Sequence, residues 1–341
     1  MPDISQRLQR AWYRRSAPWA LRPLSGLYRL IIATRRALYR LRVLSSDHPG
    51  VPVVVVGNIS VGGTGKTPVV QWLASQLRAR GVAVGIATRG YGGSDAGPRI
   101  VDSAASADQV GDEALLLART TDAPVCVARR RALAARTLAR HGCTLILCDD
   151  GLQHLALRRD LEIAVIDARR GLGNGAMLPA GPLREPVKRL RSVDLLLING
   201  GSTAPGLPAA LSAQAIGFDL ALHPAQSLTD GQPRPLSDFA AGTVHAVAGI
   251  GDPGRFFTAL RAAGLALIEH AFADHHAYRP GDLAFNDDRP VLMTQKDAVK
   301  CTAFADGRMW CVPVGARFAQ HDAARIVEKI LHLLPGGGPW K

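Results

Sequence analysis

A glycine-rich loop between a predicted strand and a predicted helix is the feature that most constrains this fold. The apolar run 51–56 predicts a buried strand, residues 57–68 then read GNISVGGTGKTP, and a helical pattern continues to Arg80. A strand, a glycine-rich loop and a helix in this order are the context of a P-loop. Ser60 stands where the GxxxxGK(S/T) pattern has its first glycine. The alternative is a glycine turn with a structural role only.

The loop carries the groups that a nucleotide triphosphate requires. Glycines let backbone N–H groups converge on a phosphate, and the helix N-terminus adds the positive end of its dipole. Lys66 can reach the β- and γ-phosphate oxygens, and Thr67 can hold Mg²⁺. The predicted nucleotide-binding residues are Ser60, Val61, Gly62, Gly63, Thr64, Gly65, Lys66, Thr67 and Pro68.

Two adjacent acids follow another predicted buried strand, 144–148. Asp149 and Asp150 would be costly to desolvate without a cation, so with Thr67 they are candidate Mg²⁺ ligands. A strand-end turn with solvated acids is the alternative. Gln153 and His154 follow closely enough to reach the same pocket and are candidate substrate contacts. For His154 a structural role is an equal alternative.

Apolar runs alternate with helical patterns along the rest of the chain, which indicates an α/β fold. We predict a P-loop NTPase-type doubly wound parallel sheet over residues 49–212. A connector rich in Pro, Gly, Ser and Ala follows, with strands near 213–243, and a second, smaller α/β domain completes 213–341. The predicted strands are 51–56, 82–87, 124–128, 144–148, 161–166, 193–198, 215–222, 244–250, 290–294 and 309–314, and the predicted later helices are 254–263 and 321–334.

The positive charge of the protein is concentrated at its N-terminus. The net charge is +13, from 41 Lys and Arg against 28 Asp and Glu. Residues 1–46 alone carry +9, with ten arginines (7, 10, 14, 15, 22, 29, 35, 36, 40 and 42), no lysine and one acid, Asp3. This distribution argues against a nucleic-acid-binding domain and favours an anionic membrane surface as partner of a basic segment, 1–48.

Residues 24–44 predict an amphipathic helix in this segment. Arg29, Arg36 and Arg40 fall on its polar side, and the apolar side holds Leu24, Leu27, Tyr28, Ile31, Leu38 and Leu41. Several arginines at about 2.5 to 3.5 kcal/mol each would oppose a bilayer-spanning position, so we expect the helix to lie on the membrane surface. The alternative is packing on the body of the protein. Arg35 and Arg42, which fall on the apolar side, favour that alternative.

Acids at a predicted helix start offer a general base. Asp112 and Glu113 open a predicted helix that runs to Thr120. Both are ordinary helix-capping residues, but on a loop after a strand Asp112 could accept a proton from an attacking hydroxyl. Glu113 is a further candidate Mg²⁺ ligand.

A polar cluster reads FADHHAY at residues 272–278. One of its two histidines could adjust such an acid, whereas metal binding and a structural role are alternatives.

Two further loops hold candidate substrate contacts. TRGYGG over residues 88–93 presents Arg89 and Tyr91, and GPLREP over 181–186 presents Arg184 and Glu185. An arginine in such a loop can contact an anionic acceptor, although both segments could equally be ordinary turns.

The loop alone leaves open which class of P-loop protein this is. Membrane-associated switch ATPases carry a signature lysine at the position where this chain has Val61. GTPases carry an (N/T)KxD motif, and TQKD at 294–297 has its lysine one place too late, so guanine specificity is unsupported. An ATPase that moves phosphate to an acceptor would use the polar clusters above. A switch ATPase acting through protein partners remains the main alternative, and a metal or nucleotide chaperone loader is another.

The motifs in this order resemble one family, the tetraacyldisaccharide 4'-kinases of lipid A biosynthesis. GNxxVGGTGKTP, TRGYGG, VGDEA, DDGLQH, GPLREP, ADHH and TQKDAVK carry the resemblance, which covers about residues 51–301 and includes a basic N-terminus of the right kind. It implies Mg·ATP as the phosphate source and an acylated glucosamine disaccharide 1-phosphate as acceptor, with lipid IVA as product. It also implies a peripheral enzyme on the cytoplasmic face of a bacterial inner membrane, and we expect a monomer.

The resemblance also implies roles for individual residues. Lys66 acts on the β- and γ-phosphates, Asp112 is the base and His275, rather than His276, is its partner. Mg²⁺ is held around Thr67, Asp149 and Asp150, and Arg184 and Glu185 bind substrate.

Overall fold

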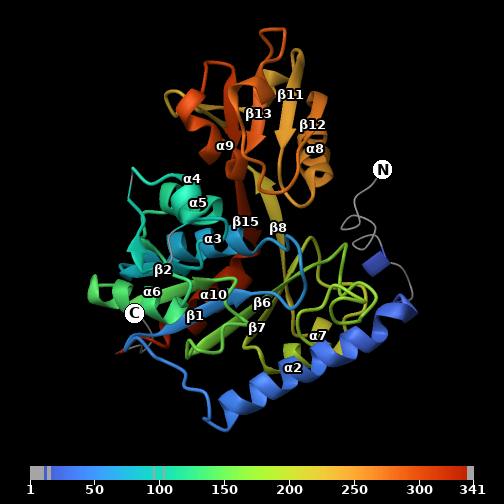
Figure 1. The fold of residues 1–341 in the computed structure, drawn as a ribbon. Helices are drawn as coiled ribbons and strands as arrows, with labels where there is room; N and C mark the ends of the chain where they lie inside the picture. The colour runs from blue at the N-terminus through green and yellow to red at the C-terminus, as the bar shows by residue number, and fades with distance from the viewer. Residues whose placement is uncertain (1–10, 14–16, 95–96, 103, 336–341) are drawn as a thin grey trace. The chain divides into compact units, whose positions relative to one another are not determined.

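The computed structural model describes residues 11–13, 17–94, 97–102 and 104–335, and the chain in it forms two compact units (Figure 1). Unit 1 holds the described residues of 1–88, 130–220 and 316–341, and unit 2 those of 89–129 and 221–315. The chain therefore passes from one unit to the other after residues 88, 129, 220 and 315, and the single boundary expected near residue 212 lies close to the third of these positions. Arginines 7, 10, 14 and 15 of the basic segment lie outside the described residues.

Unit 1 is built on a largely parallel sheet. Its strand order is β15-β8-β7-β6-β1-β5-β2, and the neighbouring strands from β8 to β2 all pair in parallel. The strands are β1 (Val53–Gly57), β2 (Val84–Thr88), β5 (Leu145–Asp149), β6 (Leu161–Asp167), β7 (Leu195–Asn199), β8 (Ile216–Leu222) and β15 (Val314–Phe318). All residues of the first five are buried, as expected for strands covered on both faces. The predicted doubly wound α/β fold is confirmed.

Some of the helices of unit 1 pack apolar side chains against this sheet. The helices of unit 1 are α2 (Arg22–Arg40), α3 (Lys66–Arg78), α6 (Arg131–Arg140), α7 (Ala209–Ser212) and α10 (Gln320–Leu331), with short η1 (Trp19–Leu21) and η2 (Val187–Ser192). Leu73 and Leu77 of α3 are fully buried. Trp72 of α3 packs on Phe318, with ring centroids 4.3 Å apart, and α10 begins two residues later. This contact joins the C-terminal helix to unit 1. The sequence analysis had instead assigned that helix to the second domain, 213–341.

One side of helix α2 contacts the rest of unit 1. The Tyr28 hydroxyl donates a hydrogen bond to the Arg184 carbonyl oxygen at 3.3 Å, and the Arg36 guanidinium lies 2.5 Å from the Glu185 carboxylate. Arg36 was expected on the solvated side of the helix, so this expectation is wrong. The buried carboxylate of Glu185 attracts it, and a helical pattern does not report that charge.

The other side of α2 exposes large apolar residues. They are Leu24, Leu27, Leu30 and Ile31, with exposed fractions of 53 to 62 %. The predicted amphipathic helix is confirmed, but Tyr28 of its apolar side faces the protein. Within the described residues, no helix combines the length and the apolar character needed to cross a membrane.

Unit 2 is built on a second, smaller sheet. Its strand order is β10-β9-β14-β13-β11-β12, with parallel pairing from β14 to β12 and antiparallel pairing of β9 with β14 and β10. These strands are β9 (Ala225–Ser227), β10 (Pro233–Arg234), β11 (Thr243–Ala248), β12 (Ala266–Ala271), β13 (Val291–Thr294) and β14 (Met309–Val312). Strand β12 was not predicted: its residues are only partly buried, and Glu269 and His270 end its short apolar run after Ile268. The short strands β3 (Arg99–Ile100) and β4 (Val125–Val127) pair with each other in antiparallel fashion.

The helices of unit 2 come from both of its chain segments. They are α4 (Ala107–Val110), α5 (Asp112–Thr120), α8 (Pro253–Ala262) and α9 (Gln295–Cys301), with short η3 (Leu236–Phe239), η4 (Pro280–Leu283) and η5 (Thr302–Phe304). The guanidinium of Arg119 on α5 donates to the Val299 carbonyl oxygen at 3.4 Å and to the Thr302 hydroxyl at 3.3 Å. These contacts bind residues 89–129 to the later segment.

The close approach at Gly57 generates a stability prediction. A Cβ atom there would lie 2.7 Å from Leu152 Cγ and 3.0 Å from the Leu152 backbone nitrogen, so the main chain would have to move. Gly57→Ala should lower the free energy of unfolding by about 1 to 3 kcal/mol in urea denaturation. Gly242→Ala, where a Cβ would meet nothing within 4 Å, is the control and should change it by at most about 0.5 kcal/mol. Equal stability of the two variants would contradict the prediction.

Candidate active site

The glycine-rich loop joins β1 to α3 in a conformation that glycine favours. Gly62 has φ of +101° and Gly65, the N-cap of α3, has φ of +94°. A Cβ on Gly65 would lie 2.8 Å from Asn199 Nδ2. L-residues rarely adopt such angles, so these two glycines are required by the backbone path as well as by close packing.

Two buried asparagines brace the loop from inside. Asn58 Nδ2 donates to the Gly62 carbonyl oxygen at 3.4 Å and approaches Thr64 Oγ1 at 3.5 Å. Asn199 Nδ2 donates to the Thr64 carbonyl oxygen at 3.1 Å. The loop shape is therefore held by hydrogen bonds of the protein itself, which is preorganisation for a phosphate.

Asp150 lies between two cations beside the loop. Its carboxylate is 3.6 Å from Lys66 Nζ and 3.0 Å from the Arg184 guanidinium. Burial alone would raise its pKa, but the positive charges of Lys66 and Arg184 outweigh burial and hold the pKa of Asp150 at about 2. Asp150 is thus ionised at neutral pH, and it holds Lys66 at the start of α3.

Thr67 and Asp149 form a pair of oxygen donors at the same place. Thr67 Oγ1 lies 3.4 Å from Asp149 Oδ2, and Asp149 is 2 % exposed. Arg131 donates to the main-chain oxygens of Asp149 and Asp150 at 3.3 and 2.9 Å, which fixes the end of β5. Within the described chain, no cluster of three or more His, Cys, Asp or Glu side chains could hold a metal. A hydroxyl and one or two carboxylates nevertheless fit Mg²⁺, which keeps several waters and binds phosphate oxygens.

Glu185 links the loop region to helix α2. Its carboxylate accepts a hydrogen bond from Gln153 Nε2 at 2.8 Å and pairs with Arg36 at 2.5 Å and Arg189 at 3.4 Å. Gln153 Nε2 also donates to the Asn58 carbonyl oxygen at 2.9 Å. The structure therefore brings two predicted substrate contacts, Gln153 and Glu185, together beside the phosphate loop. The carbonyl of a third, His154, accepts from Arg159.

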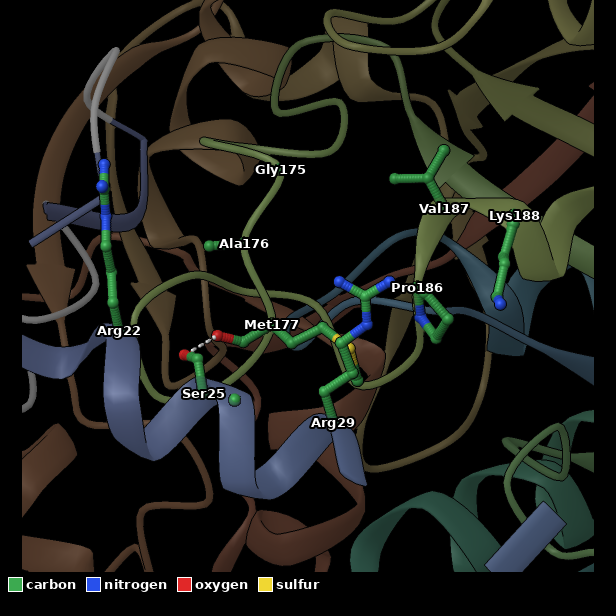
Figure 2. A pocket seen from close by; sticks show the side chains of 10 residues that line it. Arg22, Ser25, Arg29, Gly175, Ala176, Met177, Pro186, Val187 and Lys188 are labelled. Carbon is green, nitrogen blue, oxygen red and sulfur yellow. Dashed lines mark hydrogen bonds between the residues drawn. The ribbon is translucent and has the colours of Figure 1, made fainter. Parts of the chain in front are cut away.

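A cavity of about 490 Å³ opens between α2 and the segment 175–188 (Figure 2). Arg22, Arg29 and Lys188 line it, and no acid does. Within the described chain, none of these cations has a carboxylate within salt-bridge distance. The Ser25 hydroxyl donates to the Met177 carbonyl oxygen at 2.7 Å and ties the two walls together. The cavity is an electropositive recess suited to an anionic group.

In unit 2, Asp112 and His275 form a hydrogen-bonded pair. His275 Nδ1 lies 2.9 Å from Asp112 Oδ2, and Asp112 is 5 % exposed at the start of α5. Both adjoining turns are unusual, because Gly111 has φ of +87° and His275 has φ of +61°. His276 instead pairs with Asp282 at 3.0 Å. The structure thus places His275, and not its neighbour, on the predicted base.

The pair shifts both pKa values in ways that favour ionised Asp112. Burial would raise the pKa of Asp112, but the hydrogen bond from His275 and the charge of Lys296 lower it below its ordinary value. The hydrogen bond to Asp112 raises the pKa of His275, against the opposing effects of burial and Lys296. An ionised, buried carboxylate of this kind can accept a proton from a hydroxyl.

The remaining predicted residues of unit 2 lie close to this pair or at its border. Tyr91 faces His275 with ring centroids 5.2 Å apart and is 62 % exposed. Arg89 is exposed at the start of the unit. Glu113 contacts Lys296 Nζ at 3.6 Å, in unit 2, whereas the other candidate Mg²⁺ ligands belong to unit 1.

Sequence reasoning missed Lys296. Its motif was read as an imperfect guanine signature and as one of the motifs of the family resemblance, but no role was given to the lysine. No local pattern places its side chain against His275.

The fold and the loop of unit 1 are those of a P-loop nucleotide-binding protein, with a preorganised phosphate loop, a lysine and oxygen ligands. Unit 2, taken by itself, contains a buried carboxylate–histidine pair.

Comparisons with known proteins identify the family. The family model described as Tetraacyldisaccharide-1-P 4'-kinase matches residues 17–332. Proteins named tetraacyldisaccharide 4'-kinase from Alkalilimnicola ehrlichii and Methylobacillus flagellatus are 50 % and 46 % identical. The alignments cover 94 % and 97 % of this chain and 96 % and 98 % of those proteins. The crystal structure of LpxK from Aquifex aeolicus in complex with ATP is 28 % identical and superposes with a TM-score of 0.78, over 93 % of this chain and 99 % of that one. The chain belongs to the tetraacyldisaccharide-1-phosphate 4'-kinase family.

The low pKa of Asp150 predicts acid sensitivity. A carboxylate with a folded pKa of about 2 stabilises the fold above its unfolded pKa, near 3.9, and loses this contribution as pH falls toward 2. The contribution is on the order of 2 kcal/mol. Asp150→Asn should therefore lower stability at pH 7 and flatten the stability profile between about pH 4 and 2. Urea denaturation of nucleotide-free protein measures both effects, with the exposed Asp288→Asn as control. An unchanged slope in Asp150→Asn would contradict the assignment.

Proposed function

We propose that the protein transfers the γ-phosphoryl group of ATP to the 4'-hydroxyl of a tetraacylated glucosamine disaccharide 1-phosphate, giving lipid IVA. The observation that carries this proposal is the family match over residues 17–332 combined with the Asp112–His275 pair. A P-loop alone binds nucleotide, whereas transfer to a hydroxyl also needs a group that accepts the hydroxyl proton. The alternative, a switch ATPase, leaves this pair without a chemical role.

The nucleotide assignment rests on the braced loop and on the ATP complex of the related LpxK. Lys66 is held beside Asp150 at the N-terminus of α3, from which its ammonium can reach the β- and γ-phosphate oxygens. Thr67, Asp149 and Asp150 would hold Mg²⁺. When bound, the ion neutralises charge on the phosphate oxygens. Lys66 would then contact the phosphate oxygens in place of the Asp150 carboxylate.

Asp112 and His275 provide the base. The carboxylate of Asp112 accepts the proton of the sugar hydroxyl as the oxygen attacks the γ-phosphorus and the bond to the β-phosphate oxygen breaks. The proton stays on Asp112 until solvent or product takes it. Two hydrogen bonds hold the carboxylate of Asp112 in place. The Nδ1–H of His275 donates to Oδ2, and the Glu113 N–H of α5 donates to Oδ1 at 2.8 Å.

The acceptor has an anionic end and acyl chains, and unit 1 has a surface for each. The 1-phosphate suits the recess lined by Arg22, Arg29 and Lys188. The exposed leucines of α2 suit acyl chains or the membrane from which the acceptor comes. We therefore place the enzyme on the cytoplasmic face of the bacterial inner membrane, attached through α2 as a monomer, with no role in nucleic-acid binding.

Transfer of γ-³²P from ATP to the tetraacyl disaccharide 1-phosphate in detergent micelles tests the proposal. Unmutated protein should label the lipid, and Lys66→Ala should not. Slow ATP hydrolysis without labelled lipid would instead support the switch ATPase.

Removal of the base should separate binding from turnover. Asp112→Ala should lower kcat by roughly 10²- to 10⁴-fold, the usual contribution of a general base. Affinity for ATP, measured by calorimetry, should stay at the unmutated value. Asp282→Ala is a matched control, because Asp282 also pairs with a histidine, His276, in unit 2. Undiminished turnover in Asp112→Ala would remove Asp112 from this role.

The electropositive recess predicts a specific defect in acceptor binding. Arg29→Glu should raise the KM for the disaccharide 1-phosphate about tenfold, since a reversed charge near the surface is worth on the order of 1 kcal/mol. The KM for ATP should not change. Arg40→Glu makes the same charge change on α2 outside the recess and is the control. Equal effects of both substitutions would indicate general attraction to the micelle rather than a phosphate site.

A further inference from the structure

The guanidinium of Arg170 lies beside the glycine-rich loop of unit 1. Its Nη1 atom is 3.1 Å from the position that a Cβ atom on Gly62 would occupy, so a side chain at Gly62 would crowd the guanidinium. Arg170 is half-buried and belongs to the same unit as the loop. The sequence analysis assigned no role to this arginine.

The topology of the sheet brings Arg170 to this place. Strand β6 pairs in parallel with β1, and Gly57 at the end of β1 is opposite Ala164 of β6. The chain therefore leaves both strands at the same edge of the sheet, where α/β folds bind their ligands. After β1 it enters the phosphate loop, and after β6, which ends at Asp167, it enters the turn that carries Arg170.

Hydrogen bonds and close packing fix this turn. The buried carboxylate of Asp167 accepts hydrogen bonds from the backbone N–H groups of Arg169 and Arg170, both at 3.0 Å. The Gly171 N–H donates to the Asp167 carbonyl oxygen at 2.8 Å, and a Cβ atom on Gly171 would collide with a neighbouring carbonyl oxygen. The Arg170 guanidinium also lies 6.0 Å from the centroid of the Tyr13 ring, which is a cation–π distance. The turn thus presents Arg170 at a defined place.

The first half of the phosphate loop has no cation of its own. Residues 57–65, GNISVGGTG, contain no positively charged side chain, and Lys66 is the first one. Lys66 and Arg184 both lie beside the Asp150 carboxylate, at 3.6 and 3.0 Å, which offsets part of their positive charge. Arg170 adds a cation at the other end of the loop. Its guanidinium presents a planar fork of N–H donors, which matches two phosphate oxygens at once.

The position along the loop indicates which phosphate Arg170 would meet. In a P-loop the backbone N–H groups hold the α- and β-phosphates, and the lysine reaches the β- and γ-phosphates. Gly62 is four residues before Lys66, at the end of the loop away from the N-terminus of α3. A guanidinium beside Gly62 therefore suits the last phosphate of the chain.

We propose that Arg170 binds the γ-phosphate of ATP and stabilises the negative charge on it during transfer, as an arginine finger supplied by the chain itself. The acceptor oxygen bonds to the γ-phosphorus and the bond to the β-phosphate oxygen breaks, so that ADP leaves. Arg170 donates hydrogen bonds to the γ-phosphate oxygens throughout and keeps its own protons. The inference rests on the proposed function, because it assigns a residue to that phosphoryl transfer.

Nucleotide affinity tests this contact without the acceptor. Arg170→Ala should lower the affinity for Mg·ATP about tenfold, which is within the usual effect of losing a hydrogen bond to a charged group. The affinity for Mg·ADP should change less than twofold, because ADP has no γ-phosphate. Calorimetry measures both. Arg169→Ala is the matched control, since Arg169 belongs to the same turn but is exposed, and it should change neither affinity.

Turnover tests the catalytic role. Arg170→Ala should lower kcat for labelling of the disaccharide 1-phosphate about 10²-fold, the usual cost of removing one donor to charge that develops in a transition state. The KM for the disaccharide 1-phosphate should change less than threefold. Added guanidinium ion at millimolar concentration should restore part of the turnover of Arg170→Ala and none in Lys66→Ala, whereas a structural role of Arg170 predicts no such rescue. Arg170→Lys, which keeps the charge without the fork, should lose less turnover than Arg170→Ala.

An unchanged ratio of ATP affinity to ADP affinity in Arg170→Ala would overturn the proposal, and so would an undiminished kcat. Thermal unfolding of each variant shows whether it folds, and Arg170→Lys serves for the same comparison of nucleotides if Arg170→Ala does not. A failure of the proposed kinase activity would appear as missing lipid label in unmutated protein. The nucleotide affinities would remain readable in that case, because they are measured without the lipid.

Discussion

Two buried asparagines hold the phosphate loop, and the rest of unit 1 depends on that support. Asn58 and Asn199 bind the loop through main-chain carbonyl oxygens, so its N–H groups remain directed toward a phosphate. Backbone bonds extend the support, since the Val61 N–H donates to the Pro182 carbonyl and the Arg184 N–H to the Ile59 carbonyl. The position of Arg184, and through it of Asp150, follows from the same loop. Breaking these hydrogen bonds would leave the buried amide groups of Asn58 and Asn199 without acceptors, which costs free energy and so favours the observed loop conformation.

Both units solve one electrostatic problem in the same way. A site for anionic substrates needs cations, and cations near buried carboxylates keep those carboxylates ionised. In unit 1 Lys66 and Arg184 do this for Asp150. In unit 2 His275 and Lys296 do it for Asp112. Burial alone would raise the pKa of both carboxylates, and the neighbouring cations are what keeps both pKa values below their ordinary range.

The local sequence was sufficient to predict those parts of the site that a single short segment of the chain forms. The P-loop and the acids at the end of β5 follow directly from a strand and its next residues, and the parallel sheet follows from strands that are apolar on both faces. The role of His275 came from family resemblance, because 163 residues separate it from Asp112 and no pattern reports that contact. Strand β12 was missed because its burial is partial, and Arg36 was placed wrongly because its partner Glu185 lies 149 residues away.

The sequence by itself determined the doubly wound fold, the phosphate loop and the basic amphipathic helix, since each depends on the periodicity or backbone angles of neighbouring residues. Only the tertiary structure decided that residues 89–129 join unit 2 and that Lys296 lies against His275. It also decided that helix α2 turns Tyr28 and Arg36 toward the protein. These arrangements depend on packing and charge pairing between segments that are distant in the sequence. Only in the folded chain do these segments meet, so that the attraction between opposite charges can offset the cost of burying them.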